Sequence, residues 1–355
     1  VAAINAANLG VTAANASAVV TLTPTTATSV VMSALVNDTV SSRNVTTATL
    51  AGSDDHAMTV TNMTTQSVTV LGGGSNAAAA NYGVLDLSMT DASGAADKMT
   101  VNLSSGAAHK SVNHDLDDLI LSNIESWTLT SNGLSATNVQ SVTALSGGAA
   151  LTELTITGSS ALTIADHSTS NTKLATINAS AFTGDLTLSD AVASLGQTIT
   201  SGAGNDSLVF AANLTNADTV DGGGNTVLTT GVMGTDSLSA TVTGATATTG
   251  ALSIANVENV NLTNAGTALI NAAGITGATQ IATGGGAGIT TYSNLAEGAT
   301  VALGFTDQSG TVTTGTTTLV LADETATTNA ITVNIHDATS NTLKATSIET
   351  VNLAL

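Results

Sequence analysis

The chain has 355 residues, of which 42% are apolar but only 2% aromatic, and 25 acidic residues against 5 basic ones give a net charge of −20. A length above that of one compact core predicts several units or one elongated body. The acidity argues against nucleic acid, whose phosphates need a basic face, and against an anionic membrane surface. Divalent cations are the natural counter-ions of so many carboxylates, and the alternative is that the acids only keep the chain soluble.

Features that the sequence lacks narrow the class of protein further. The chain contains no cysteine, which excludes disulfides, zinc–thiolate sites and cysteine nucleophiles. It has no apolar run of transmembrane length, so no membrane span is predicted. It starts at Val1 with neither a methionine nor a charged-then-apolar leader, and we interpret it as a processed product or a piece of a longer protein. These features favour an extracellular protein that becomes rigid without disulfides.

Strand patterns dominate the chain from beginning to end. Apolar residues alternate with Thr, Ser or Asn over four to seven positions in "MTVTNM" from Met58, "KMTVNL" from Lys98, "LTELTITG" from Leu151, "GDLTLSD" from Gly184 and "AITVNIHD" from Ala330. Clusters of Gly, Asn, Asp and Ser separate these stretches, and none of the chain keeps a helical period for three turns. The sequence therefore predicts an all-β fold.

A two-strand unit occurs three times. The phrases "LSNIESWTLTS", "IANVENVNLTN" and "ATSIETVNLAL" share a branched apolar residue, a Glu, a polar residue, Val or Trp, and a Leu; their glutamates are Glu125, Glu258 and Glu349. A second strand precedes each phrase by about twenty residues and starts at Asp97, Asp236 and Asn329. We divide the chain accordingly into a divergent N-terminal β region (1–120), a solenoid module with the glycine turns described below (121–253) and a further solenoid module (254–355).

Degenerate strand repeats joined by Gly- and Asn-rich turns predict an elongated parallel β-solenoid, of the β-helix or β-roll type, with coils of about 18–22 residues. The alternative is a row of tandem immunoglobulin-like β-sandwiches. A single tryptophan, together with Pro24 as the only proline, counts against that alternative, since sandwich domains with long loops usually contain several prolines.

One glycine turn carries a metal-binding pattern. "SGAGNDSLV" from Ser201 matches the calcium-binding β-roll repeat G-G-x-G-x-D-x-U-x except at its first glycine. The glycines allow positive φ, the Asp supplies an anionic oxygen, and calcium needs six or more oxygens, so a second, stacked turn is required. "DGGGNTVL", twenty residues later, is the candidate, with Thr226 in place of Asp206. The candidate ligand positions are Gly202, Gly204, Asn205, Asp206, Asp218, Asp221, Gly222 and Gly224. The alternative is a pair of glycine turns without metal.

The turn, the "IExVxL" phrases and the phrase "INASAFTG" together resemble the RTX-type surface-layer (S-layer) proteins of Gram-negative bacteria over most of 97–355. The resemblance implies type I secretion, a calcium-dependent β-solenoid, and self-assembly into a two-dimensional coat on the cell surface. It implies three partners: calcium ions, further copies of the chain, and a cell-surface polysaccharide bound through a region outside this chain. Gly202, Gly204, Asp206, Gly222 and Gly224 carry over as calcium positions. The single good motif departs from the tandem copies that are usual in the family.

Other acids have more than one interpretation. The repeat glutamates Glu125, Glu258 and Glu349 are either further metal ligands, or acceptors of backbone N–H groups at a coil corner, or solvent-facing residues. Asp115, Asp117 and Asp118 in "NHDLDDL" form either a site or a solvated face.

The sequence predicts no enzyme. The five histidines lie in no metal-ligand spacing, and no G-x-S-x-G nucleophile turn occurs. A secreted adhesin or glycan-binding solenoid is the alternative function, and it needs a flat face of T-x-T phrases at a constant coil spacing. The phrases at 59–61, 128–130 and 155–157 are irregularly spaced along the chain, which argues against that alternative.

Overall fold

The computed structural model describes residues 11–16, 19–24, 29–31, 38–41, 45–50, 57–72, 80–81, 83–104, 114–132, 139–167, 170–189, 196–225, 234–242, 250–285, 288–305, 315–325, 327–336 and 341–355. Its regular structure is almost entirely strand, with one 3-10 turn, η1 (Ala272–Gly274). No helix in this part of the chain has the length and apolar character that a membrane crossing requires. The chain forms two compact units, here named the N-terminal unit (Val1–Leu188) and the C-terminal unit (Ser189–Leu355).

The N-terminal unit consists of two parallel sheets. The first sheet contains, in order of pairing, β3 (Ser29–Val31), β5 (Thr47–Leu50), β7 (Ser67–Gly72), β10 (Lys98–Ser104), β12 (Ser126–Asn132), β14 (Glu153–Gly158) and β16 (Thr176–Phe182). The second sheet contains β2 (Val19–Pro24), β4 (Asp38–Ser41), β6 (Ala57–Met63), β9 (Val84–Met89), β11 (His114–Ile120), β13 (Val139–Ser146), β15 (Ala161–Asp166) and β17 (Leu186–Ser189).

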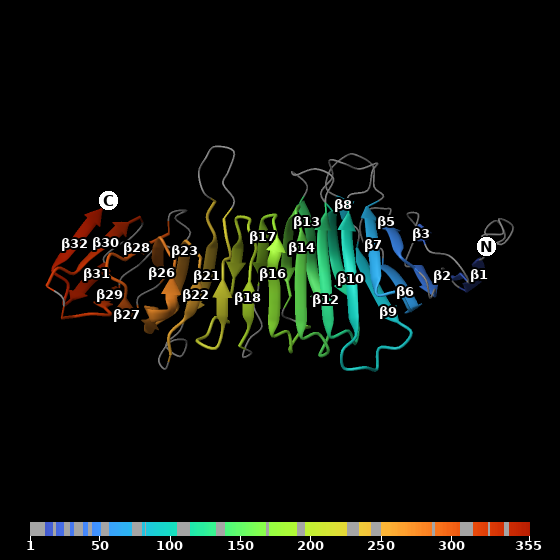
Figure 1. Ribbon diagram of the computed structural model, residues 1–355, viewed down its shortest axis with the longest axis horizontal. Coiled ribbons are helices and arrows are strands. Elements are labelled where there is room, and N and C mark those ends of the chain that lie inside the picture. Colours follow the sequence, from blue (N-terminus) through green and yellow to red (C-terminus); the bar gives the residue numbers. More distant parts are fainter. Residues whose placement is uncertain are drawn as a thin grey trace. The chain divides into compact units, whose positions relative to one another are not determined.

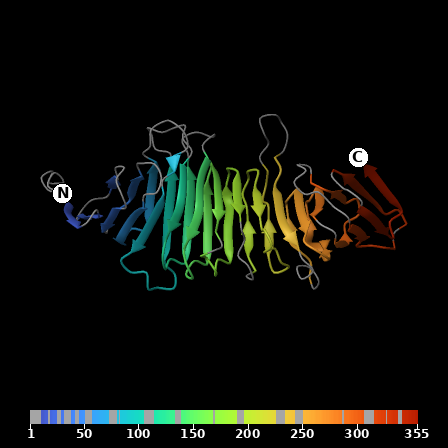
Figure 2. The same cartoon turned by 180° about the vertical axis from the view of Figure 1, so that it is seen from behind.

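Successive strands of this unit alternate between the two sheets, so each coil of the chain contributes one strand to each sheet. Figure 1 shows β10, β12, β14 and β16 of the first sheet side by side, and Figure 2 shows the same unit from behind. The short strand β8 (Ala80–Asn81) also pairs with β11, and β1 (Val11–Ala16) forms an antiparallel hairpin with β2. The other strand pairs described in the unit are parallel, as a succession of stacked coils requires.

The C-terminal unit is also built of stacked coils, and its strands form three parallel ladders. The longest contains β19 (Ser207–Val209), β21 (Ser237–Val242), β23 (Asn259–Asn264), β26 (Gln280–Gly285), β28 (Thr300–Leu303), β30 (Ala330–Ile335) and β32 (Thr350–Ala354). A second ladder contains β18 (Thr198–Thr200), β20 (Thr219–Asp221), β22 (Ser253–Ala255) and β25 (Ile275–Thr276), and a third contains β24 (Ala268–Asn271), β27 (Ile289–Leu295), β29 (Gly315–Leu321) and β31 (Asn341–Thr346).

The core of each unit consists of inward-facing columns of apolar side chains. In the first sheet of the N-terminal unit, Met99, Trp127, Leu154 and Ile177 occupy one register position on successive strands, and all four are at most 1% exposed. Apolar side chains suit such columns because each one packs on its equivalents one strand spacing away. Trp127 also donates its indole N–H to the carbonyl of Ile124 at 3.1 Å, so its polar edge is satisfied inside the core.

The predicted all-β parallel solenoid is confirmed, and the parallel ladders exclude tandem immunoglobulin-like sandwiches. In the C-terminal unit, Ile281 pairs with Val301 and Ile331 with Val351, twenty residues apart in each case, which agrees with the expected coil length. In the N-terminal unit some coils are longer, because Lys98 pairs with Ser126, and Ser126 with Glu153. The three modules that the repeats indicated stay a prediction.

Candidate metal-binding turns

The two glycine turns lie on one edge of the C-terminal unit and are bonded to each other. Ser201 N donates to Asp221 O at 2.8 Å, and Gly224 N donates to Gly202 O at 2.9 Å. The Ser201 hydroxyl donates to Gly222 O at 2.6 Å. The turns follow the paired strands β18 and β20, in which Thr200 is opposite Asp221. The predicted stacking of these turns is therefore confirmed; Thr226 lies outside the described residues.

Two glycines of the second turn, Gly222 and Gly223, let successive coils approach closely. A Cβ on Gly222 would overlap the carbonyl oxygen of Asn256, and a Cβ on Gly223 would overlap that of Gly202. Positive φ was expected at Gly202 and Gly204, whereas in these two turns the left-handed backbone falls on Gly223, with φ of 81°. A side chain at Gly223 would thus be disfavoured both by its backbone conformation and by the carbonyl that faces it.

Asp206 belongs to a column of acids, one on each of three successive coils. Its side chain is 1% exposed, and its Oδ2 accepts a hydrogen bond from Gly202 N at 3.0 Å. Asp206 N donates to Oδ1 of Asp236 at 2.7 Å, and Asp236 N donates to Oε2 of Glu258 at 2.7 Å. We name Asp206, Asp236 and Glu258 the acid column; they directly precede β19, β21 and β23. The carboxylates of Asp236 and Glu258 thus bind the backbone of the coil before them, whereas that of Asp206 binds the glycine turn of its own coil.

Asp236 was recognised in the sequence only as the start of a strand and not as a site residue. The sequence could have identified it, because the same tripeptide, Asp-Ser-Leu, begins at Asp206 and at Asp236. Asp236 is fully buried and lies against the second turn, since a Cβ on Gly222 would come within 2.9 Å of Asp236 Oδ2. It therefore connects the two glycine turns with the acid column.

The remaining predicted ligands bind the turn backbone. Asp218, 3% exposed, accepts Gln197 N on Oδ1 at 2.8 Å and Thr215 N on Oδ2 at 2.7 Å. Asp221 Oδ1 accepts Gly223 N at 2.9 Å and Asn256 Nδ2 at 2.8 Å. The side-chain oxygen of Asn205 accepts Thr235 N at 3.0 Å. These groups hold the turns in shape, as carboxylates and amides commonly do in tight turns.

Among the oxygen atoms of these turns, the carboxylates of Asp206 and Asp236 offer the best position for a cation. Two buried carboxylates on adjacent coils repel each other, and burial disfavours charge that is not compensated, so a divalent cation at this point would be stabilised. Calcium needs six to eight oxygens, so turn carbonyls would have to supply the rest. Within the described ranges, no three acidic or histidine side chains come together at one point.

The three repeat glutamates share one geometry. Glu125 Oε2 accepts Asp97 N at 2.8 Å, Glu258 Oε2 accepts Asp236 N at 2.7 Å, and Glu349 Oε2 accepts Asn329 N at 3.0 Å. The three donors are the residues at which the preceding strands of the repeat were expected to start. The repeat is therefore a pair of neighbouring ladder strands, β10–β12, β21–β23 and β30–β32, joined through the glutamate.

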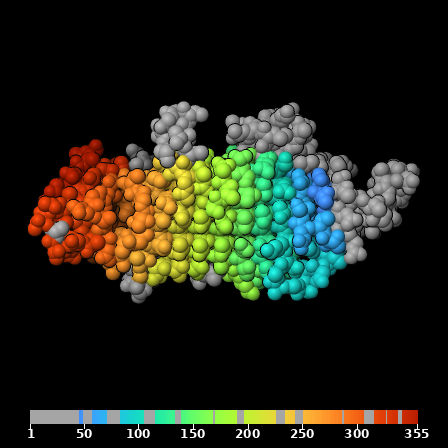
Figure 3. Space-filling view, viewed as in Figure 1, coloured from blue at the N-terminus to red at the C-terminus, as the bar shows by residue number. Residues whose placement is uncertain are grey.

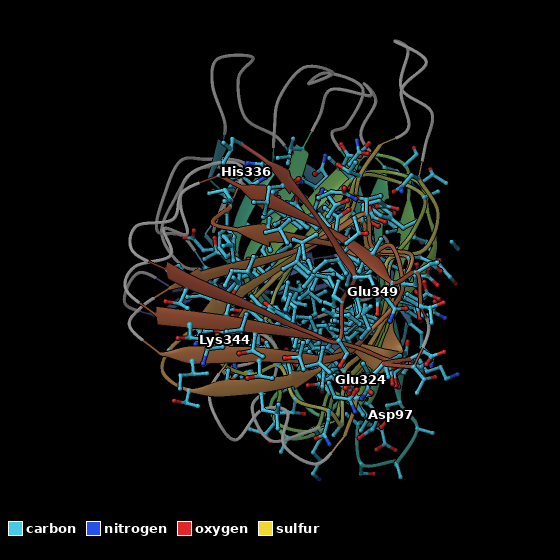
Figure 4. The ribbon with its side chains drawn as sticks, turned by 90° about the vertical axis from the view of Figure 1, so that its left-hand side faces the viewer. Asp97, Glu324, His336, Lys344 and Glu349 are labelled. Atoms are coloured by element: carbon cyan, nitrogen blue, oxygen red, sulfur yellow. The ribbon has the colours of Figure 1, made fainter. Side chains whose placement is uncertain are left out.

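A left-handed residue stands two positions before each of these glutamates. Asn123, Asn256 and Ser347 have φ of 61°, 53° and 55°. The chain turns sharply there and directs the glutamate back to the coil before it, and asparagine tolerates this conformation better than most residues. In Figure 4 Lys344 and His336 lie away from Glu349, on other sides of the coil. The repeat glutamates thus follow the interpretation as backbone acceptors at a coil corner.

Outward side chains of the first sheet of the N-terminal unit form columns of hydroxyl and amide groups. We name these residues the threonine face: Ser67, Thr100, Thr128, Thr155 and Asn178 in one column, and Thr69, Asn102, Thr130 and Thr157 in the next. The phrases at 128–130 and 155–157 stand directly opposite each other, Thr128 to Thr155 and Thr130 to Thr157. Their irregular spacing along the chain reflects unequal turns between the strands, and the phrase at 59–61 belongs to the second sheet.

The second sheet of the same unit is acidic. We name Asp86, Asp115, Asp117, Asp118 and Asp166 the acidic face. Burial and the charges of Asp166 and Asp117 raise the pKa of Asp118, against a lowering hydrogen bond from Ser146. Burial and the charge of Asp118 raise the pKa of Asp86. The predicted acidic cluster therefore extends over strands β9, β11 and β15, and its members repel one another.

Searches of family models, of curated proteins and of solved structures found no match to this chain.

Proposed function

We propose that the chain is a structural protein of a bacterial cell surface, secreted and self-assembling into a two-dimensional coat. The observation that carries this proposal is the stack of coils in each unit, which repeats outward side chains at the strand spacing and so builds flat, regular surfaces. Such surfaces suit repeated contacts between copies. The resemblance to RTX-type surface-layer proteins supports the same function, and the proposal assigns the chain no catalytic role.

Calcium is the cation that we propose for the acid column. Asp206 and Asp236 would supply the anionic oxygens, and the stacked turns around Gly202 and Gly222 would supply carbonyls. The net charge of −20 gives a reason for calcium between copies as well, because like-charged chains repel until divalent ions link their carboxylates.

Electron microscopy of the purified protein with and without calcium tests the coat. We expect sheets or regular arrays with calcium, their loss in a strong chelator, and no replacement of calcium by monovalent salt. Well-dispersed particles under all calcium concentrations would contradict the coat. Arrays that persist unchanged in the chelator would contradict calcium as the link between copies while leaving the coat in place.

Substitution of Asp206 tests the calcium turn. Asp206→Ala removes a carboxylate that also accepts Gly202 N, so the variant should lose about 1–3 kcal/mol of stability even without calcium. The diagnostic readout is therefore the rise in melting temperature on adding calcium, which should shrink in Asp206→Ala and in the milder Asp206→Asn. A tenfold rise in Kd at saturating calcium corresponds to about 1.4 kcal/mol of lost stabilisation.

The control is Asp185→Ala, because Asp185 is an exposed acid outside the turns. It should leave the calcium-dependent shift unchanged. Equal shifts in the wild type, both Asp206 variants and Asp185→Ala would mean that the glycine turns hold no calcium.

A secreted adhesin is the second candidate, and the threonine face is the observation that favours it, because two T-x-T phrases stack in register. The coat is preferred because hydroxyl groups of this face bond to each other, Thr130 Oγ1 to Thr157 Oγ1 at 2.9 Å, and are thus less available to a sugar. Binding of the monomeric protein to a glycan array, lost on Thr128→Arg, would establish the adhesin.

A further inference from the structure

The threonine face is accessible to solvent, and covering it with another protein surface should cost little free energy. The strand β10 alternates, with Met99, Val101 and Leu103 inside and the intervening residues outside, and β12 does the same; a bulge interrupts the pairing of β14 with β16. Figure 3 shows the corresponding teal-to-green surface as a continuous face. Hydrogen bonds join neighbouring strands of this face: Thr130 bonds Thr157 at 2.9 Å within a column, and Asn102 Nδ2 donates to Ser67 Oγ at 3.4 Å diagonally between the two columns. Polar groups that already have partners lose little when water is removed.

Charge is almost absent from this face although the whole chain carries −20. At the described outward positions of β7, β10, β12, β14 and β16, only Lys98 and Glu153 are charged, and both are exposed. Two copies of so acidic a chain can approach most closely where neither is acidic. The threonine face meets that condition, whereas the acidic face does not.

Lys98 and Glu153 also make the face self-complementary. Lys98 pairs in register with Ser126, and Ser126 pairs with Glu153, so the two charges lie in one column at equal distances on either side of β12. A two-fold axis in the plane of the face, parallel to β12, places β10 opposite β14 of the partner. Lys98 then faces Glu153 of the partner subunit, and the symmetry repeats this ion pair.

We propose that the threonine face is a docking surface for a second copy of this chain, packed face to face about that axis. Because the axis is parallel to β12 and the strand spacing of the two faces is identical, each threonine column lies directly opposite the same column of the partner, as in contacts between stacked sheets. Five strands at about 4.8 Å and some six residues along each give roughly 400–500 Å² per partner. That area is at the low end for specific interfaces, so the dimer is weak and reversible in solution and gains strength by repetition in a coat.

This inference rests on the proposed function and names one contact of the coat. Sedimentation equilibrium over a wide concentration range, in a chelator and at low ionic strength, measures the contact without calcium. We expect the wild type to dimerise, and Lys98→Glu to raise the dimer Kd at least about tenfold, since it places like charges opposite each other twice. Glu153→Lys should do the same, and the double variant Lys98→Glu/Glu153→Lys should restore dimerisation to within about threefold of the wild type.

Thr128→Arg, at the middle of the face, should abolish the dimer, and Thr163→Arg is the matched control on an outward position of β15 in the second sheet. Far-ultraviolet circular dichroism and melting curves of every variant verify folding. A wild type that is monomeric at all concentrations, single charge variants without effect, or a double variant no better than either single one would each overturn the docking surface. So would equal effects of Thr128→Arg and Thr163→Arg.

Electron microscopy separates this inference from the proposed coat. Arrays that form equally in the wild type and in Thr128→Arg would overturn the docking surface and leave the coat. A dimer that responds to the charge variants as expected, without arrays at any calcium concentration, would support the docking surface and contradict the coat.

Discussion

The threonine face and the acidic face of the N-terminal unit are formed by the same coils but behave differently. On the threonine face, hydroxyl groups in a column bond to one another, as Thr130 and Thr157 do at 2.9 Å. On the acidic face, Asp118 pairs with Val84 and lies diagonally from Asp86, and its column leads through Ala144 to Asp166. Burial and the neighbouring negative charges raise the pKa values of Asp86 and Asp118. A parallel stack places equivalent positions one strand spacing apart, so it multiplies whatever chemistry a column contains.

The polar groups of each outward column therefore have to bond to one another or be compensated by neighbouring groups. Serine hydroxyls partly compensate the acids: Ser141 donates to Asp115 Oδ1 at 2.7 Å, and Ser146 donates to Asp118 Oδ2 at 3.0 Å. Like charges in neighbouring strands still destabilise a sheet. The acidic face is therefore kept at some cost in stability, and the threonine face at little or none.

The largest effect is expected where the backbone of the threonine face is closest packed. Gly158 ends β14 with φ of 113°, and a Cβ there would overlap the carbonyl oxygen of Ser131 on the neighbouring coil. Gly158→Val should cost at least about 2 kcal/mol and disturb the register of β12 and β14. Chemical denaturation measures the loss, and Gly148→Val is the control, because Gly148 also has positive φ but no atom within 4 Å of a Cβ. Equal losses in the two variants would show that close packing between coils does not matter at Gly158.

A smaller effect tests whether the threonine column is self-satisfying. Thr130→Val and Thr157→Val each leave one hydroxyl without its partner and should cost up to about 1 kcal/mol, since both residues are only partly buried. The double variant should be nearly as stable as the wild type, because valine favours strands and no orphaned hydroxyl remains. A double-mutant cycle from urea denaturation gives the coupling energy. Strict additivity of the two losses would argue that the hydroxyls act independently.

The smallest effect concerns the acidic face. The raised pKa of Asp118 means that the folded state favours its protonated form, so stability is present at low pH and is lost as pH rises from the ordinary aspartate pKa of 3.8 through the folded pKa. Asp118→Asn should raise the melting temperature of the protein slightly at neutral pH, and this gain should disappear below about pH 3.8. A gain that stays constant with pH would show that the buried charge of Asp118 is not its cause. Asp91→Asn is the exposed control on the same unit; hydrogen bonds from Ser93 lower the pKa of Asp91, so this variant should bring no gain at neutral pH.

Much of the fold followed from the sequence because its signals are local. Alternation in "KMTVNL" and the Glu phrases identified β10 and its ladder partner β12 correctly, and the twenty-residue interval between glycine turns predicted their stacking. The register of the threonine face did not follow, because unequal turn lengths separate Thr128 and Thr155 from their neighbours along the chain. Asp236 was missed as a site residue because its importance depends on which coil lies beside it.

The glutamate corners have a consequence for how the protein reaches its native state. Glu125, Glu258 and Glu349 each bind a backbone N–H that lies only 28, 22 or 20 residues earlier in the chain. The length of the loop that must close for each new coil is thus the length of one coil and does not grow with the chain. The entropy of loop closure is therefore nearly constant along the molecule. We expect growth by successive addition, each finished coil serving as the template for the next, with a folding rate that depends weakly on the number of coils.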